Sequence, residues 1–203
     1  MSRVLYQPVL NQAINDNSAI IRGCQDRLDA MVAFCENKFG SSLSEKSFLD
    51  IGSCYGFFVN AFNGLCSIVT GIENGNKQFN MTRIFYPDIS SQINKEDFTE
   101  TIDGYQNYDI VSLLSVLHSI IISDGADHAA EILRKIDAKT NDVLFIDMGQ
   151  ENELIYNSSM SGWNKDSIAQ WVLNETSFDV CEPLIEDSDP RFGRTLFACY
   201  RNK

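Results

Sequence analysis

The sequence predicts an α/β protein with a doubly wound, mostly parallel sheet and helices on both faces. Apolar segments of strand length alternate with segments of helical periodicity along most of the 203 residues. Parallel strands need crossover connections of this kind. A glycine-containing turn joins the first apolar strand to the following helix, within residues 47–74. Because 44% of the residues are apolar, one sizeable core is expected, and residues 1–203 are expected to form a single domain.

An N-terminal helical extension, residues 1–46, precedes the α/β region. Apolar residues recur at helical spacing between Asn15 and Asn37, which predicts one amphipathic helix there. Residues 38–46 are rich in serine and are expected to form the loop into the first strand.

The remaining elements follow from periodicity and from the positions of glycine and proline. Pro87 is expected to end the helix that follows the second strand. The polar stretch 150–162 is long for a connection, and such connections are more often functional than idle. The sequence predicts helices at 74–86, 124–139 and 166–175, and a hairpin turn at 187–193.

The turn after the first strand has the features of a ligand pocket. Gly52 and Gly56 carry no side chains, so the main chain can approach a bound molecule, and the next helix directs free N–H groups to the same place. Glu73 ends the second strand roughly 20 residues further on, where a carboxylate can accept hydrogen bonds from a ribose diol. The ligand is therefore expected to contain a nucleoside. A dinucleotide fingerprint would need a small residue in place of Phe57, which argues against a nicotinamide oxidoreductase.

The segment Asp50-Ile-Gly52-Ser-Cys54-Tyr-Gly56 follows the pattern Asp-x-Gly-x-Gly-x-Gly except at Cys54. It resembles motif I of the class I methyltransferases, which bind S-adenosylmethionine. This resemblance implies that Asp50 lies near the methionine amino group and that Glu73, with Asn74 beside it, holds the ribose hydroxyls. The loop under the methionine and ribose would comprise Gly52, Ser53, Cys54 and Gly56. By the same resemblance the N-terminal helix acts as a lid over the ligand; the alternative is that it only packs against the sheet.

The resemblance continues in family order from about Phe48 to Tyr200. Residues 94–98 resemble the adenine-side segment, with Asp97 available to the exocyclic amine and Phe98 flanking the ring. Residues 108–119 resemble the fourth strand and the loop after it, which implies that Ser115 lies at the cofactor, near the methyl-transfer centre. The fifth strand and a closing antiparallel hairpin would be residues 142–147, 178–184 and 194–200, so the resemblance implies seven strands.

His118 is the candidate catalytic residue. Methyl transfer mainly requires that donor and acceptor be aligned, and a base is needed only where the acceptor carries a proton. Histidine can act as that base near neutral pH. The alternative is that His118 only hydrogen-bonds the backbone or stacks on the substrate. His128, between Asp127 and Ala129, is expected at the surface.

Aromatic and basic residues offer further contacts for an acceptor. Tyr55, Tyr156 and Trp163 could line a pocket, although core packing is the simpler explanation for each one alone. Arg191 and Arg194 could meet a phosphate or carboxylate, although an exposed arginine is usually only solvated.

Composition excludes several classes of protein. A formal net charge of −12 argues against long nucleic acids as partners, because binding several phosphates needs a basic surface. No stretch approaches the roughly 20 apolar residues of a membrane span, and no secretory signal is recognised, so a cytoplasmic protein is expected. The six cysteines are dispersed without a C-x-x-C pair, which predicts reduced thiols and no metal site.

Two functions follow from these observations. The first is transfer of a methyl group from S-adenosylmethionine to oxygen, or less readily nitrogen, of a small molecule or glycan. Residues 50–58 and 114–118 are similar to methyltransferase domains that act on phosphate-capped bacterial polysaccharides. The second is a catalytically silent, methyltransferase-like subunit that binds a protein partner. The sequence indicates no oligomeric state.

Overall fold

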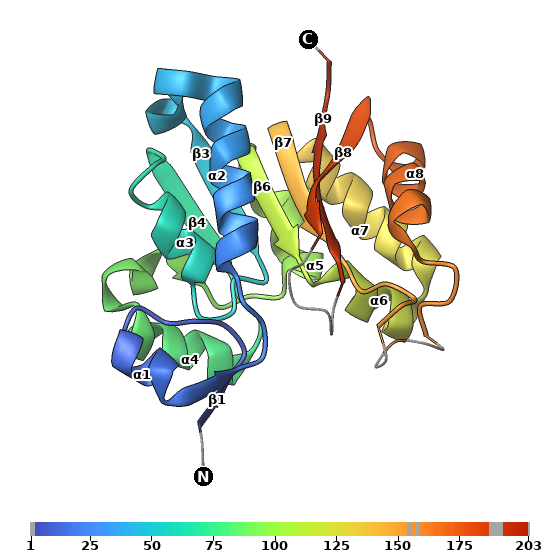
Figure 1. Ribbon diagram of the computed structural model, residues 1–203. Coiled ribbons are helices and arrows are strands. Elements are labelled where there is room, and N and C mark those ends of the chain that lie inside the picture. The colour runs from blue at the N-terminus through green and yellow to red at the C-terminus, as the bar shows by residue number, and fades with distance from the viewer. Residues whose placement is uncertain (1–2, 154–155, 157–158, 187–192, 203) are drawn as a thin grey trace. The chain divides into compact units, whose positions relative to one another are not determined.

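The computed structural model describes residues 3–153, 156, 159–186 and 193–202. The fold is the predicted α/β class: a mostly parallel sheet of seven strands in the order β5-β4-β3-β6-β7-β9-β8, with antiparallel C-terminal strands and helices around it. The chain divides into two compact units, Met1–Phe98 and Thr99–Lys203. Figure 1 colours the first from blue to green and the second from green to red.

The first unit contains three parallel strands of the sheet, β3 (Ser47–Ile51), β4 (Ile68–Ile72) and β5 (Ile93–Asn94). Every residue of β3 is buried, as in strands covered on both faces. The connections are α3 (Phe57–Phe62) between β3 and β4, then α4 (Asn76–Phe85) and the 3-10 helix η2 (Pro87–Gln92). Helix α3 packs on both β3 and β4, and Phe62 stacks on Phe48 with ring centroids 3.9 Å apart.

The N-terminal residues do not form the single helix predicted for residues 15–37. Instead α1 (Gln12–Asp16) is followed by β2 (Ser18–Ile20), which pairs in parallel with β1 (Arg3–Leu5), and a longer helix α2 (Gln25–Phe39) begins later. The cause is local: Asn17 and Ser18 turn their side chains back to the carbonyls of Ala13 and Ile14. Such bonds compete with helix propagation. The expected loop 38–46 is the end of α2 plus a 3-10 helix, η1 (Gly40–Glu45).

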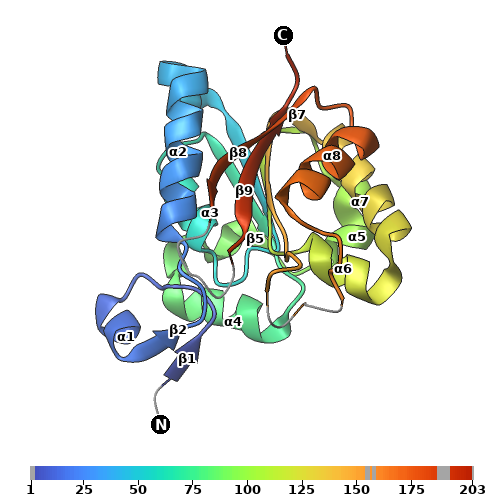
Figure 2. The ribbon, with the colours of Figure 1, turned by 45° about the vertical axis from the view of Figure 1, so that its right-hand side comes forward.

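The second unit contains the parallel pair β6 (Tyr108–Leu114) and β7 (Thr140–Asp147), and the antiparallel strands β8 (Val180–Glu186) and β9 (Thr195–Tyr200). Strand β9 also pairs antiparallel with β7. Its helices are α6 (Leu117–Asp124), α7 (Ala126–Ala138) and α8 (Lys165–Glu175). Figure 2 shows α7 and α8 side by side, in contact. Two short helices, α5 (Phe98–Thr101) and η3 (Ile102–Gly104), precede β6.

Most sequence-based elements of this unit are confirmed, with one exception. Residues 115–119 were expected to be a loop, but α6 begins at Leu117, and Gly125 at φ 92° separates α6 from α7. Helix 166–175, strand 142–147 and the C-terminal strand pair agree with the prediction within a few residues. The hairpin turn predicted at 187–193 lies outside the described residues except for Gly193. Cys181 and Cys199 face each other across β8 and β9, with their Sγ atoms 3.0 Å apart.

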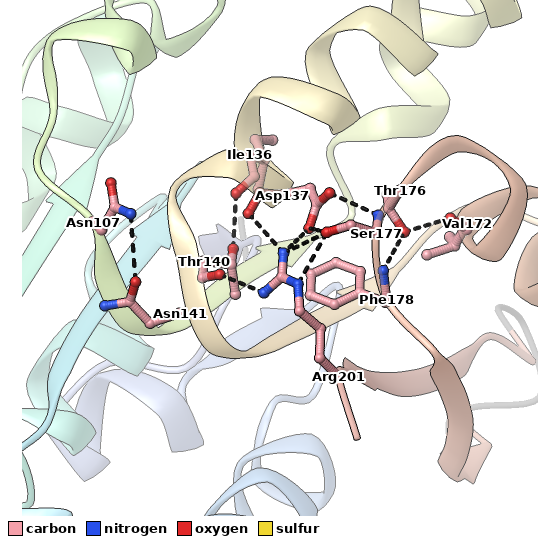
Figure 3. Close-up of polar contacts among 10 residues, drawn as sticks. All are labelled: Asn107, Ile136, Asp137, Thr140, Asn141, Val172, Thr176, Ser177, Phe178 and Arg201. Atoms are coloured by element: carbon pink, nitrogen blue, oxygen red, sulfur yellow. Dashed lines mark hydrogen bonds and ion pairs between the residues drawn. The ribbon is translucent and has the colours of Figure 1, made fainter. Parts of the chain in front are cut away.

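Arg201 fastens the end of β9 to the rest of the unit (Figure 3). Its guanidinium donates to the Thr140 carbonyl at 2.8 Å and to Ser177 Oγ at 2.8 and 2.9 Å, and it forms an ion pair with Asp137. Asp137 also accepts from the backbone N–H of Ser177 at 2.8 Å. The arginine lies over the ring of Phe178, 4.7 Å from the centroid. One side chain thereby joins α7, β7 and the start of the C-terminal hairpin.

We expect Arg201→Ala to lower the free energy of unfolding by about 2 to 3 kcal/mol, because it leaves the carboxylate of Asp137 partly buried without its cation. Urea unfolding of the whole chain measures this. Arg134→Ala is the matched control: its ion pair with Glu175 is exposed (53% and 28% of the side chains), so its loss should stay within about 1 kcal/mol. Equal effects of the two substitutions would contradict the assignment.

Candidate functional site

The loop between β3 and α3 is the centre of the site in the first unit. The N–H groups of Gly52 and Ser53 both donate to the carbonyl of Ile72, at 2.8 and 3.0 Å, which fixes the loop to the end of β4. Gly52 and Gly56 adopt positive φ angles of 77° and 95°, as the glycine pattern leads one to expect, and Cys54 also has a positive φ of 53°. The thiol of Cys54 is buried, and burial raises its pKa well above the ordinary value, so it stays protonated and is no nucleophile.

Glu73 holds this loop in shape. Its Oε2 accepts a 2.7 Å hydrogen bond from the N–H of Cys54, and its Oε1 accepts from the N–H of Gly75. Burial raises the pKa of the Glu73 carboxyl, against the opposing effect of these two donors. Since a carboxylate has about four lone-pair sites, Glu73 retains acceptor capacity for a ligand.

The other residues predicted for cofactor binding in this unit surround the same loop or follow β5. Asp50 is 2% exposed, within β3. The Oγ of Ser53 is fully buried and has no hydrogen-bond partner among the described residues. Asn74 donates to Asp97 at 2.8 Å, so the two positions predicted to lie by the ribose and the adenine are in contact. Phe98, at the start of α5, is mostly buried.

The N-terminal segment also contacts the loop between β3 and α3. The sequence predicted no residue for this contact. The side chain of Gln7 is 6% exposed and accepts from the N–H of Tyr55 at 3.4 Å. Tyr86 donates to the carbonyl of Pro8 at 3.1 Å. Arg27 of α2 lies 5.6 Å from the ring centroid of Phe58, the second residue of α3. No periodic pattern marks Gln7, because its contact spans 48 residues of sequence.

A second polar cluster, built on Ser115, Asp147, Glu153 and Arg194, lies in the second unit. Arg194 is 3% exposed and donates to both oxygens of the buried Glu153, at 2.7 and 2.8 Å. It also donates to Ser115 Oγ at 3.0 Å, and Ser115 donates to Asp147 at 2.9 Å. Ser115 has a φ of 62°, uncommon for a residue with a side chain. Arg194, proposed from sequence as a contact for an anionic acceptor, therefore has its charge offset by Glu153.

His118 lies beside this cluster, in the first turn of α6 and not in a loop. It is 4% exposed, and its Nε2 is 3.0 Å from the hydroxyl of Tyr156. The guanidinium of Arg194 lies 5.6 Å from the ring centroid of Tyr156. Gly149 lies directly under that ring: a Cβ there would be 2.9 Å from Tyr156 Cδ2. Tyr156 was one of three aromatic candidates, and it is the one that contacts His118.

The remaining candidate residues pack against other aromatic side chains, lie at the surface or fall outside the described residues. Tyr55 packs edge-on against Phe85, and Trp163 edge-on against Trp171. His128 lies at the surface, 3.6 Å from Glu131. Arg191 lies outside the described residues. Within the described ranges, no cluster of three or more histidine, cysteine or acidic residues could hold a metal ion. No helix there has the length and apolar character to cross a membrane.

Comparisons with known proteins bear on this fold. No family model matches. The chain is 23% identical over 157 residues to the O-antigen chain terminator bifunctional methyltransferase/kinase WbdD of Escherichia coli, a match that covers 75% of this chain and 22% of WbdD. A solved structure of WbdD matches with a TM-score of 0.77 at 17% identity, over 97% of this chain and 43% of that chain. The chain thus spans well under half of the length of WbdD.

Two shorter proteins also match in structure. Magnesium protoporphyrin IX methyltransferase (ChlM) from Synechocystis PCC 6803, solved with bound SAM, has a TM-score of 0.64 at 12% identity, over 88% of this chain and 79% of that chain. The N-methyltransferase NodS from Bradyrhizobium japonicum WM9 has a TM-score of 0.65 at 11% identity, over 88% of this chain and 96% of that chain.

The geometry of the loop leads to a test by glycine substitution. A Cβ at Gly56 would lie 2.9 Å from Cδ1 of both Ile89 and Ile93, on a backbone with φ 95°. We expect Gly56→Ala to lower the free energy of unfolding by about 1 to 3 kcal/mol. Gly64→Ala is the control, because nothing lies within 4 Å of its Cβ. Thermal unfolding compares the two, and equal stabilities would contradict a strained loop at Gly56.

Proposed function

We propose that this chain, which has the fold of the class I S-adenosylmethionine-dependent methyltransferases, binds S-adenosylmethionine and transfers its methyl group to an acceptor. The observation that carries the proposal is the link between Glu73 and the loop: the carboxylate at the end of β4 accepts from the N–H of Cys54 at 2.7 Å. This hydrogen bond joins the motif Asp50 to Gly56 to the acid that we predict to bind the ribose.

The described residues fit this cofactor. Ser53 Oγ is buried without a hydrogen-bond partner among the described residues, and Glu73 has spare lone pairs for a diol. The residues proposed to hold the cofactor are those predicted in the first unit: Asp50, Gly52, Ser53, Cys54, Gly56, Glu73, Asn74, Asp97 and Phe98, with Ser115 in the second. Bound S-adenosylmethionine supplies a methyl group activated by a positively charged sulfur.

The proposed acceptor is an oxygen of a small molecule or glycan, which can itself be phosphorylated. WbdD, named as an O-antigen chain terminator, supports a glycan acceptor. The net charge of −12 supports an acceptor other than long nucleic acid. We propose that residues 1–203 act as one methyltransferase domain, with 1–46 as its N-terminal extension, and that the protein works in the cytoplasm.

Cofactor binding tests the proposal directly. Isothermal titration of the whole chain with S-adenosylmethionine, and separately with S-adenosylhomocysteine, should give saturable heat at a single site. Lack of heat with both compounds would remove the enzyme assignment and leave the alternative, a silent subunit for a protein partner. Electron density or mass spectrometry of a copurified adenosine derivative would provide independent support.

The carboxylate of Glu73 should contribute to the affinity for S-adenosylhomocysteine. We expect Glu73→Gln to weaken S-adenosylhomocysteine binding by about 1.5 to 3 kcal/mol, because hydrogen bonds to a charged acceptor are lost. Asp88→Asn removes an exposed acid in the same unit and should leave the affinity unchanged. Titration calorimetry measures both, and unchanged affinity in the Glu73 variant would contradict the ribose assignment.

The raised pKa of Glu73 predicts a pH dependence of affinity. The ionised carboxylate is the better acceptor for ribose hydroxyls, so binding should weaken as the pH falls through the pKa of Glu73. Because that pKa lies above the ordinary carboxyl value, weakening should begin at a higher pH than for a solvated glutamate. Calorimetry between pH 4 and 8 measures it, and the Glu73→Gln variant should lack this dependence.

A further inference from the structure

We propose that Cys181 and Cys199 are a redox-active pair that forms a reversible disulfide bond by exchange with a small-molecule disulfide. Cys181, on β8, is the thiol that reacts first, and Cys199, on β9, completes the bond. Both residues lie within the second unit. The inference goes beyond the proposed methyl transfer and does not depend on it.

The strand register brings the two cysteines together, although 18 positions separate them in the sequence. They are direct partners in the antiparallel pair of β8 and β9, which Figures 1 and 2 show side by side. Directly opposite residues in such a pair have Cα atoms about 4.5 or 5.5 Å apart. Both values lie within the range of about 4.4 to 6.8 Å that a disulfide spans, so the strands need not slide for the bond to form.

The two side chains already point toward each other. The thiol of Cys199 donates to the sulfur of Cys181, with the Sγ atoms 3.0 Å apart. Both thiols are free in the structure. A disulfide needs its sulfurs at about 2.05 Å, so they have to approach by only about 1 Å more. The reduced pair is therefore positioned for oxidation.

Burial gives the two thiols different roles. Cys199 is fully buried, and this burial, together with its hydrogen bond to Cys181, raises the pKa of its thiol. Cys181 is half-buried, on the strand that ends the order of the sheet. In thiol–disulfide exchange a thiolate attacks a sulfur of the oxidant, so the attacking thiol needs both access and loss of its proton. Cys181 meets these needs better than Cys199 and is the first to react.

The reaction consists of two exchange steps, written here with oxidised glutathione as the oxidant. Cys181 releases its proton to water, and its sulfur bonds to one sulfur of the oxidant while the sulfur–sulfur bond of the oxidant breaks. The departing thiolate takes up a proton from water. The sulfur of Cys199 then bonds to the sulfur of Cys181, and its proton passes to the second departing thiolate. The two cysteines are oxidised, and the oxidant is reduced to two molecules of glutathione.

The bond would fix the register of the C-terminal strand pair covalently. Strand β9 lies between Arg194 and Arg201 in the chain, and its register determines where both arginines lie. In the order of the sheet, β8 has β9 as its only neighbour. The disulfide would therefore hold an edge strand that is otherwise joined to the sheet on one side.

Peptide mapping of the whole chain tests for the bond. The reduced protein is incubated with an excess of oxidised glutathione, its remaining thiols are alkylated, and it is digested without a reductant. We expect the peptide that contains Cys181 to be joined to the peptide that contains Cys199, in monomeric protein, and dithiothreitol to separate them again. Cys66→Ser is the matched control, because Cys66 is the other half-buried cysteine, and it should leave the joined peptides unchanged.

Two further variants test the order of the steps. Cys199→Ala should stop the reaction after the first exchange, so Cys181 should carry one glutathione, detected by mass spectrometry. Cys181→Ala should leave Cys199 without glutathione under the same conditions, because the buried thiol is not accessible to the oxidant.

Three outcomes would overturn the inference. The first is the lack of joined peptides at excess oxidised glutathione, and the second is a bond from either cysteine to a different cysteine or to another chain. The third is attachment of glutathione to Cys199 in Cys181→Ala. The map of the unaltered protein decides whether the bond forms even where a variant fails to fold. None of these outcomes concerns cofactor binding, so the proposed methyl transfer would stand.

Discussion

The carboxylate of Glu73 is the constraint on which the first unit depends. The loop from Gly52 to Gly56 must present backbone and not side chains, and yet it includes Cys54, which adopts a positive φ. Such a conformation is strained for a residue with a side chain, at about 1 to 3 kcal/mol. The 2.7 Å bond from the Cys54 N–H to Glu73 compensates for this strain. An acid predicted to bind the ribose therefore also shapes the loop before any ligand arrives.

In the second unit, too, a carboxylate stabilises a group that would otherwise be unfavourable where it lies. A buried arginine is tolerated only when its charge has a counter-charge and its N–H groups have acceptors. Glu153 offsets the charge of Arg194, and Glu153 and Ser115 accept its hydrogen bonds. The satisfied guanidinium can then lie near the ring of Tyr156. The buried ion pair in this unit lies beside Tyr156, which contacts His118, and its arginine is not an open anion site.

The sequence predicted the fold well where local patterns dominate. Strand β3 contains three apolar residues among five, Gly52 and Gly56 adopt positive φ, and α7 has a clear helical stripe, so these elements were recognisable. The N-terminal helix was predicted wrongly because hydrophobic spacing across residues 15–37 concealed the helix-breaking bonds of Asn17 and Ser18. Hydrophobic periodicity does not register such local bonds from side chain to backbone.

In the candidate site, too, features set by local sequence were predictable and contacts between distant residues were not. The position of Glu73 at the end of β4 was predictable, because it lies one strand after a glycine turn; its role toward a ribose stays a prediction. The contact of Gln7 with Tyr55 and the pairing of Arg194 with Glu153 were not, because they join residues 48 and 41 positions apart. Sequence reasoning treated Arg194 as an exposed cation, and only the fold reveals its buried partner.

Strand β9 explains why such a distant pairing can be formed reliably. It begins beside Arg194 and ends beside Arg201, and it pairs with both β7 and β8, so its register is fixed on two sides. Arg201 fastens one end to Asp137 and Thr140, while Arg194 fastens the other to Glu153 and Ser115. A one-residue slip would turn every side chain of the strand to the opposite face and displace both arginines. The position of Arg194 against Tyr156 is therefore set by the packing of the whole hairpin.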